Sequence, residues 1–295
     1  GVGPETLMKA NPRLIYGSST GYGLSGPDRN NLAMDLTIQA VGGVMSINGL
    51  EDGPPLKTGL AICDFLGAVH LYSGIMTALY ERSVTGKGRL VEVAMQEALY
   101  PALASNLASL QRGGWKPPVR RGNRHPTFGS SPYNVYPCRD GHIAIICVRE
   151  IHWTNLLEVM GRQDLDGEER FATQALRAEH EDEIDAIVEN WLKDLPKDEA
   201  TQILKDNRIP AAPVRDLVEV TADRHMRERG MLHDVDHPDM GHIVLPTSPL
   251  RFGGSPEPEL RPEPAIGEHN ADVLADWLGY DAKRIAALTA AGVLC

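Results

Sequence analysis

The sequence lacks the features that mark several common protein classes. Only four cysteines stand in 295 residues, Cys63, Cys138, Cys147 and Cys295. They form no CxxC pair and have no accompanying histidine spacing, so we expect reduced thiols, no disulfide framework and no metal site. Lys and Arg total 29 against 40 Asp and Glu, and the net charge of −11 argues against nucleic acid as a partner.

Long apolar runs and phosphate-binding loops are also missing. No run of about 18 apolar residues occurs, which predicts no transmembrane helix and no membrane partner. Residues 1–16 show neither an apolar segment nor a basic leader, so we expect no signal peptide and a cytoplasmic protein. The segment from Thr85 to Gly88, TGKG, lacks the spacing of a P-loop, and ATP-driven chemistry is not indicated.

A glycine-rich loop follows a strand predicted over residues 13–18. Gly21 to Gly26 satisfies the GxGxxG pattern of dinucleotide-binding proteins. We reject that interpretation, because the last glycine should open a helix whose N-terminus holds the pyrophosphate, and here Pro27 begins a loop. Ligands of α/β proteins do bind beyond the carboxyl ends of strands. Tyr22 is therefore a candidate to line a pocket, the alternative being simple packing beside the loop.

One acid stands within the most apolar part of the chain. Asp64 follows Leu60, Ala61, Ile62 and Cys63, and it precedes apolar residues at three-and-four spacing. This pattern predicts a buried helix from Asp64 to about Arg82. Asp is typical of an N-cap, where it stabilises a helix by about 0.5 to 2 kcal/mol. The local pattern leaves a capping role and a functional carboxylate both open.

Changes in composition predict an α/β protein with two domains. Residues 1–112 read as part of a Rossmann-like large domain, and residues 113–132, rich in glycine and proline, as a linker. Basic side chains of this linker would either pair with an anionic ligand or lie in solvent. A smaller α+β domain is predicted over 133–230, and residues 231–295 return to the large domain with C-terminal helices. Further predicted elements are helices over 32–47, 97–110 and 217–229, a hairpin with its turn at 139–141, and strands over 89–94 and 249–252.

Seven motifs follow one another along the chain. They are NPRLIYGSSTGYG (11–23), DLTIQAVGG (35–43), GPPLKTGLAICD (53–64), TGKGRLVEVAMQEA (85–98), RRGNRHPT (120–127), IPAAPV (209–214) and GEHNADVLADWLGY (267–280). In this order they resemble the class III CoA-transferase family, which includes formyl-CoA transferase, carnitine CoA-transferases and α-methylacyl-CoA racemase. The resemblance implies the class III CoA-transferase fold and an interlocked homodimer. It also implies that the N-terminal part of the Rossmann-like domain precedes residue 1, so the large domain is incomplete here.

The resemblance implies a reaction as well. Family members move CoA from an acyl-CoA donor to a carboxylic acid acceptor, through a nucleophilic aspartate at the position of Asp64. A covalent aspartyl intermediate divides one difficult exchange into easier acyl transfers. Coenzyme A is then a substrate, and no permanently bound cofactor is expected. The implied partners are an acyl-CoA, a carboxylic acid and a second copy of the chain.

The same resemblance implies further site residues. Tyr22 matches a tyrosine that lines the acyl site. Phe128, Gly129, Ser130 and Ser131 match a loop that closes over the aspartate. That loop is a glycine run in formyl-CoA transferase, and the departure implies a different acyl preference. Positions expected to contact CoA are Thr20, Met45, Met95 and Arg124, although methionine in such a strand is also typical of plain core packing.

Two alternatives remain. A racemase of this fold would pair the acid at the Asp64 position with a histidine directly before Asp35, as two bases for α-proton exchange. Met34 occupies that position, which disfavours the racemase. The other alternative is a non-catalytic chain that acts only as a binding partner of the N-terminal part.

Overall fold

The computed structural model describes residues 2–117, 119–125, 129–256 and 258–294. Its contacts divide the chain into two compact units, Gly1–Val214 and Arg215–Cys295. The unit border at Val214 is earlier than the predicted end of the small domain at residue 230. The predicted domain borders at 112, 132 and 230 stay predictions.

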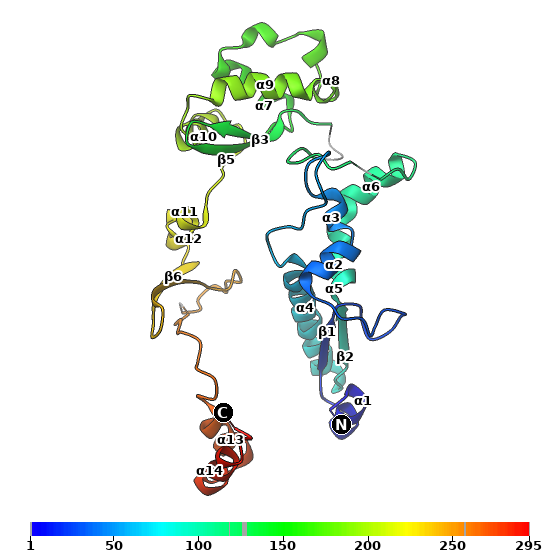
Figure 1. Cartoon of the computed structure of the whole chain (residues 1–295), viewed down its shortest axis with the longest axis vertical. Coiled ribbons are helices and arrows are strands. Elements are labelled where there is room, and N and C mark those ends of the chain that lie inside the picture. Colours follow the sequence, from blue (N-terminus) through cyan, green and yellow to red (C-terminus); the bar gives the residue numbers. More distant parts are fainter. Residues whose placement is uncertain (1, 118, 126–128, 257, 295) are drawn as a thin grey trace. The chain divides into compact units, whose positions relative to one another are not determined.

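The first part of the first unit is a parallel βαβ arrangement (Figure 1). Strand β1 (Tyr16–Thr20) pairs with β2 (Leu90–Ala94), and helix α4 (Ile62–Thr85) packs against both strands. Parallel strands require such a crossover, and their carboxyl ends share one edge. Thr20 lies opposite Ala94 at that edge. The other helices of this part are α1 (Pro4–Ala10), α2 (Asp35–Val41), α3 (Val44–Ile47), α5 (Met95–Leu99), the 3₁₀ turn η1 (Tyr100–Leu103) and α6 (Ala104–Arg112).

Two predicted helices of this part are broken in the structure. The helix predicted over 32–47, with an end near Gly42 and Gly43, ends at Val41 as α2, and a separate α3 follows because Gly43 adopts φ 88°, a left-handed conformation that ends a helix. The helix predicted over 97–110 divides into α5, η1 and α6 around Pro101, which has no N–H to continue the hydrogen-bond ladder. The predicted end near Gly42 and Gly43 is confirmed, whereas the continuation to residue 47 and the single helix over 97–110 are wrong.

The second part of the first unit, the small subdomain, is an antiparallel sheet covered by helices. Strand order is β3 (Tyr133–Cys138), β4 (Gly141–Ile146), β5 (Ala211–Pro213), and the predicted hairpin with its turn at Arg139 and Asp140 is confirmed. Its helices are α7 (Glu150–Met160), η2 (Gln163–Leu165), η3 (Glu169–Phe171), α8 (Gln174–Glu179), α9 (Glu181–Leu192) and α10 (Lys197–Asp206). Its core includes the buried side chains Tyr136, Ile143, Trp153, Leu156, Phe171, Ile184 and Leu204.

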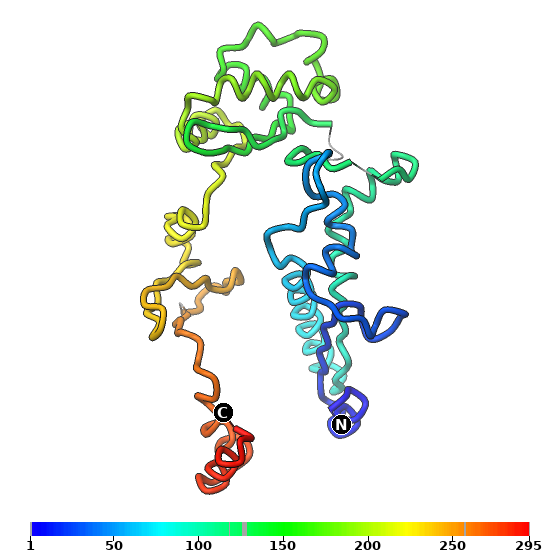
Figure 2. Tube along the Cα trace, viewed as in Figure 1, coloured from blue at the N-terminus to red at the C-terminus, as the bar shows by residue number. Residues whose placement is uncertain are grey.

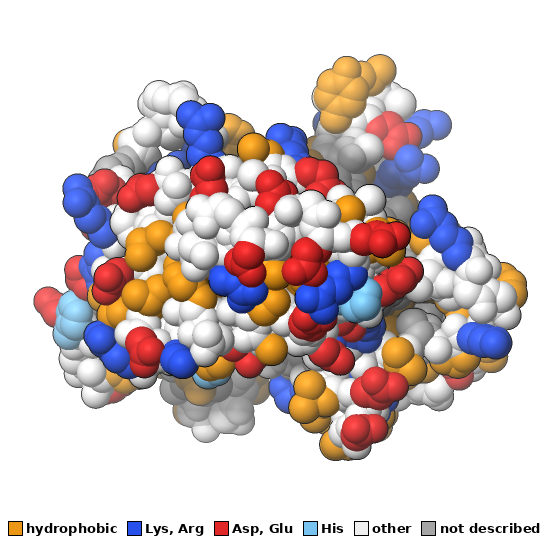
Figure 3. Space-filling view, turned by 90° about the horizontal axis from the view of Figure 1, so that it is seen from above, with side chains coloured by type: hydrophobic (Ala, Val, Ile, Leu, Met, Phe, Trp, Pro, Cys, Tyr) orange, Lys and Arg blue, Asp and Glu red, His pale blue; other side chains and the backbone are white. Residues whose placement is uncertain are grey.

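The surface over these helices carries charges of both signs. Figure 3, a view from above, shows acidic and basic side chains interspersed over one face. Arg170 of η3 pairs with Glu183 at 2.6 Å, and Arg162 with Asp164 at 2.9 Å. Exposed pairs of this kind contribute about 0 to 1 kcal/mol each. Their contribution to stability is therefore small.

The second unit contains short elements. Helices α11 (Leu217–Thr221) and α12 (Arg224–Glu228) precede a hairpin of β6 (Leu232–His237) and β7 (Gly241–Pro246), and helices α13 (Asn270–Leu278) and α14 (Ala282–Ala290) close the chain. The helix predicted over 217–229 is wrong, because Asp223 caps a separate α12 by accepting from the Met226 N–H. The strand predicted over 249–252 is also wrong, since the described residues between β7 and α13 form an irregular segment (Figure 2).

Helix α4 departs most from expectation. Its predicted buried stripe is largely exposed, because strands β1 and β2 and helix α5 contact only part of its surface. The exposed apolar residues are Phe65, Val69, Tyr72, Met76, Tyr80 and Val84. With 24 residues, α4 is long and apolar enough by length and composition to cross a membrane, a test that the core helix of a globular protein also passes. The expectation of no transmembrane helix stays a prediction.

The backbone at Gly88, just before β2, lies so close to Leu14 that we expect no larger residue to be tolerated at this position. A Cβ at Gly88 would lie 1.9 Å from the carbonyl oxygen of Leu14, which is backbone and cannot move aside. Gly88→Ala should therefore lower the free energy of unfolding by about 3 kcal/mol, measured by urea denaturation. The control Gly253→Ala, where no atom lies within 4 Å of the added Cβ, should change it by less than about 0.5 kcal/mol. Equal effects would contradict the steric argument.

Candidate active site

Asp64 lies in the first turn of α4. The helix begins at Ile62 after Ala61, so the prediction that Asp64 is the N-cap is wrong. The Asp64 side chain is exposed. Unpaired N–H groups at a helix start favour a carboxylate by about 0.3 to 1 kcal/mol. The arrangement thus presents an exposed carboxyl group at the start of a helix.

The acceptor that caps this helix comes from another helix. Ala61 has no side-chain acceptor, and the Cys63 N–H instead donates to Asp35 Oδ1 at 2.8 Å. Asp35 is the first residue of α2. The sequence-based reading missed this residue as part of the site. Its place at the head of the DLTIQAVGG motif was the only available signal.

Gln39, one turn further along α2, completes this connection. Its side chain is fully buried. The Gln39 Nε2 donates to Asp35 Oδ2 at 2.6 Å and to the Leu60 carbonyl at 3.1 Å. The Gln39 Oε1 accepts from the Thr58 N–H at 2.9 Å. Segment 58–61, which leads into α4, is therefore bound to α2 by side-chain hydrogen bonds.

Cys63 stands beside Asp64 in the chain but is not a candidate nucleophile. Its thiol is buried, and burial, with further contributions from Asp35 and Asp64, raises its pKa to about 11. A thiol with that pKa is neutral at ordinary pH, and the thiolate is the nucleophilic form. Cys63 instead packs in a small core with Ile38, Val44 and Leu99.

Several predicted site residues gather around this small core. Tyr22 and Met95 pack against it, and Met45 follows Val44 in α3. Helix α4 approaches Met95 closely, since a Cβ at Gly67 would lie 3.2 Å from its Cγ. Thr20 Oγ1 accepts from the Gly23 N–H at 2.8 Å and so shapes the glycine loop. Their roles toward substrate stay predictions.

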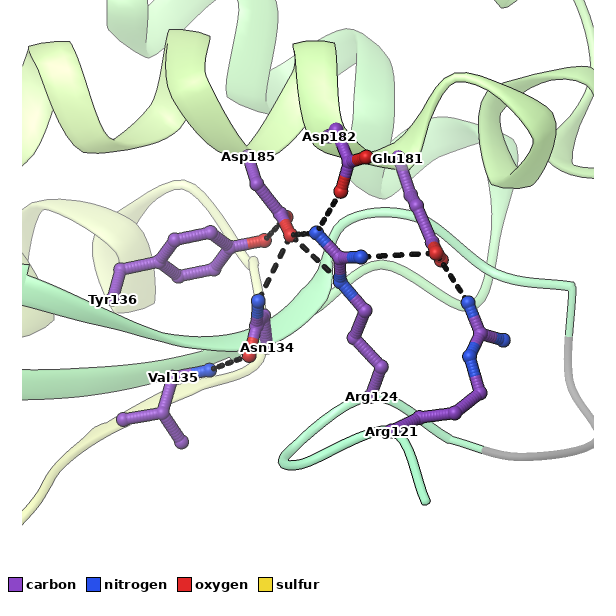
Figure 4. A network of polar contacts seen from close by, with 8 residues as sticks. All are labelled: Arg121, Arg124, Asn134, Val135, Tyr136, Glu181, Asp182 and Asp185. Atoms are coloured by element: carbon purple, nitrogen blue, oxygen red, sulfur yellow. Dashed lines mark hydrogen bonds and ion pairs between the residues drawn. The ribbon is translucent and has the colours of Figure 1, made fainter. Parts of the chain in front are cut away.

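Arg124 lies in a different cluster (Figure 4). Its guanidinium pairs with Asp185 at 2.5 Å, Asp182 at 2.8 Å and Glu181 at 3.0 Å, all on α9. Burial alone would lower the Arg124 pKa, but the bonds to Asp185 and Asp182 outweigh it and raise that pKa. A role of Arg124 in CoA binding stays a prediction, and it would require the phosphate to compete with three carboxylates.

The other linker arginines also bind protein groups. Arg121 pairs with Glu181, while Arg120 donates to the carbonyls of Leu50 and Glu51 at 3.1 and 3.3 Å. The sequence left two options open for these basic residues, an anionic ligand or solvent. The structure shows a third arrangement, in which they attach segment 120–124 to the loop that carries Leu50 and Glu51 and to α9.

Asp185 is the centre of the small-subdomain network. Besides Arg124, its carboxylate accepts from the Tyr136 hydroxyl at 2.6 Å and from the Asn134 amide at 2.8 Å. Burial, and then Asp185, holds the pKa of Tyr136 well above its usual range, so the hydroxyl remains a donor. The linker is therefore attached to a buried, hydrogen-bonded point between β3 and α9.

The predicted loop over the aspartate is only partly described. Phe128 lies outside the described residues, and Gly129 is exposed. Ser130 is buried, donates to the Cys147 carbonyl at 2.8 Å and accepts from Gln174 at 2.9 Å. Ser131 is also buried, and its carbonyl accepts from Arg177 Nε at 3.2 Å. Both serine side chains lie within the small subdomain here, and their acyl-site role stays a prediction.

The network predicts unequal effects of two substitutions. Asp185→Ala would leave the Tyr136 hydroxyl and the Asn134 amide without this acceptor and would remove one of the three carboxylates that pair with Arg124, so it should lower the free energy of unfolding by about 3 to 5 kcal/mol. Tyr136→Phe removes one donor only and should cost about 1.5 to 3 kcal/mol. Urea unfolding followed by the fluorescence of the tryptophans measures both. A loss for Asp185→Ala no larger than that for Tyr136→Phe would contradict the central position of Asp185.

Comparisons with known sequences bear on the family. The model of "CoA-transferase family III" matches residues 1–270. Formyl-CoA:oxalate CoA-transferase of Streptomyces coelicolor is 32% identical over 98% of this chain and 73% of the relative. Succinate–glutarate CoA-transferase of Agrobacterium fabrum is 32% identical over 94% of this chain and 68% of the relative. These findings confirm the resemblance that the motifs predicted, and with it the prediction of a class III CoA-transferase.

A comparison with solved structures agrees. The crystal structure of a CAIB/BAIF family protein from Brucella suis matches with a TM-score of 0.79 and 31% identity, over 93% of this chain and 71% of that one. The predicted class III CoA-transferase fold fits this neighbour. The division into domains and the homodimer stay predictions.

Proposed function

Because the chain belongs to CoA-transferase family III, we propose that it moves coenzyme A from an acyl-CoA to a carboxylic acid, with Asp64 as the covalent nucleophile. One observation carries this proposal. Asp64 is exposed on the first turn of α4, and a hydrogen bond that the Cys63 N–H donates to Asp35 Oδ1 fixes the start of that helix. A nucleophile on a rigid helix end is positioned before its substrate arrives.

The proposed reaction uses two acyl transfers in each direction. An Asp64 oxygen attacks the thioester carbonyl of the donor, the carbon–sulfur bond breaks, CoA leaves as the thiolate, and a mixed anhydride between Asp64 and the donor acyl group remains. The thiolate then attacks the aspartyl carbonyl and releases the donor acid as a carboxylate, which leaves an aspartyl thioester. The acceptor carboxylate attacks that thioester, and the same steps in reverse produce the new acyl-CoA and restore Asp64.

The substrates belong to a class rather than to one pair. The names of the relatives pair formyl-CoA with oxalate and succinate with glutarate. Oxalate, succinate and glutarate are small carboxylates. We propose small carboxylates as acceptors here, with Tyr22 at the acyl site because it packs beside the core that carries Cys63. No permanently bound cofactor, a homodimer and a cytoplasmic location remain part of the proposal.

Removal of the Asp64 carboxylate tests the nucleophile. Asp64→Ala should lower kcat for CoA exchange between an acyl-CoA and its acceptor acid by about 10⁴-fold or more, because no other group can form the anhydride. The matched control is Asp198→Ala, which removes an exposed aspartate from the first turn of another helix, α10. It should keep the activity of the parent protein.

The proposal fails if Asp64→Ala retains full exchange. It also fails if the protein washes deuterium into the α-position of a 2-methylacyl-CoA without an acceptor acid, since that is racemase chemistry. Met34, the residue directly before Asp35, is 74% exposed and carries no titratable group. The described residues therefore offer no second base at the position where a racemase would need one.

A further inference from the structure

Gln39 is a buried amide whose hydrogen-bonding capacity is completely used. Both hydrogens of Nε2 have acceptors, Asp35 Oδ2 and the Leu60 carbonyl. The Oε1 accepts from the Thr58 N–H, and the Thr58 hydroxyl lies 3.2 Å away as a second donor. Buried polar groups that are fully satisfied fix a local conformation, because every alternative leaves one of them unpaired.

The partners of Gln39 require an amide at this position. The Thr58 N–H can only donate and the Leu60 carbonyl can only accept. One side chain must therefore present an acceptor and a donor side by side, and the orientation of the amide follows from these two partners. An ionised carboxylate would lack the donors, and an aliphatic side chain would lack both.

These bonds reach the candidate nucleophile through a short path. Gln39 donates to one oxygen of Asp35, and the other oxygen of Asp35 accepts from the Cys63 N–H, next to Asp64. Thr58 and Leu60 lie in the segment just before α4, which forms no helix or strand of its own. Two sets of bonds from α2 therefore hold the first turn of α4: Asp35 binds the Cys63 N–H, and Gln39 binds the segment before the helix.

We propose that Gln39 is a positioning residue for Asp64, which fixes segment 58–63 and thereby the placement of the carboxylate against substrate. This inference rests on the proposed function. Gln39 touches no reacting atom and acts through Asp35 and the backbone. A misplacement of about 1 Å in such a site costs on the order of 10² in rate.

The variant Gln39→Glu tests the donor requirement with almost no change in shape. Its ionised carboxyl cannot donate to the Leu60 carbonyl, and it stands beside Asp35 as a like charge. Burial and the Asp35 charge both raise the pKa of the introduced carboxyl, and Asp64 and the Cys63 thiol are the nearest further titratable groups on α4. Protonation restores one donor and removes the repulsion, so the defect should be present at high pH and recover as pH falls.

We expect Gln39→Glu to lower kcat about 10²-fold at pH 8, with a smaller change in KM for acyl-CoA, and to regain at least tenfold of that loss at pH 5.5 relative to the parent protein at the same pH. Gln39→Leu should lose a similar factor at both pH values, since it has no proton to gain. The matched control is Gln202→Glu, an exposed glutamine on α10 that receives the same charge and should follow the pH profile of the parent.

Hydrogen exchange gives a readout that does not depend on turnover. Peptides covering residues 58–64 should exchange faster in Gln39→Glu than in the parent at pH 8, and the difference should shrink at pH 5.5. Unchanged exchange, or faster exchange with unchanged kcat, would overturn the positioning role. A loss of kcat without recovery at low pH would also overturn it. If the parent protein itself exchanges no CoA, the proposed function fails instead, and the exchange of 58–64 still decides whether Gln39 fixes this segment.

Discussion

The hydrogen bond between the Asp35 carboxylate and the Cys63 N–H is the interaction on which the candidate site depends. A helix start leaves N–H groups without partners, and the N-cap residue of α4, Ala61, has no side-chain acceptor for them. The missing acceptor comes from α2. This requirement brings α2 against the start of α4, so the carboxylate of Asp64 stands on a helix end that cannot fray independently.

The small core reinforces the same arrangement from the apolar side. Cys63, Ile38, Val44 and Leu99 are buried together, and they come from α4, α2, α3 and α5 respectively. Burying these side chains contributes about 1.5 to 3 kcal/mol for each large aliphatic one. Hydrogen bonds thus orient the helix start, while apolar contacts keep the four helices together. Asp64 is exposed, and its own side chain belongs neither to this core nor to these hydrogen bonds.

The arginines of segment 113–132 form ion pairs within the protein. The sequence left an anionic ligand and solvent open as their partners, and Arg121 and Arg124 bind carboxylates of α9. Asp185 is buried and also accepts from Tyr136 and Asn134. Removing its carboxylate would therefore leave both of these donors without their acceptor. The positive charges of Arg121 and Arg124 thus attach this segment to the small subdomain.

Elements that depend on neighbouring residues in the chain were predicted correctly from the sequence. The β3–β4 hairpin and the strand at 90–94 follow from residue alternation, β-branched residues and turn residues. Gly42 and Gly43 marked the end of α2 in the sequence, and Pro101, which breaks the helix predicted over 97–110, is a local signal of the same kind. The remaining misses involve distance along the chain. Asp35 caps a helix 28 residues away and Arg124 pairs with Asp185 61 residues away, and no periodicity encodes such contacts. The apolar stripe of α4 was predicted to be buried and is largely exposed, because apolar spacing along a helix does not determine which other segment packs against it.

The central claim is that Asp64 carries CoA during turnover. The most direct measurement is to incubate the protein with acyl-CoA, quench with hydroxylamine and map the modified peptide by mass spectrometry. An aspartyl thioester reacts with hydroxylamine to give a hydroxamate and free CoA, so the account predicts a hydroxamate on Asp64 that forms only when acyl-CoA is present. Turnover without modification of Asp64, or modification at another residue, would contradict it.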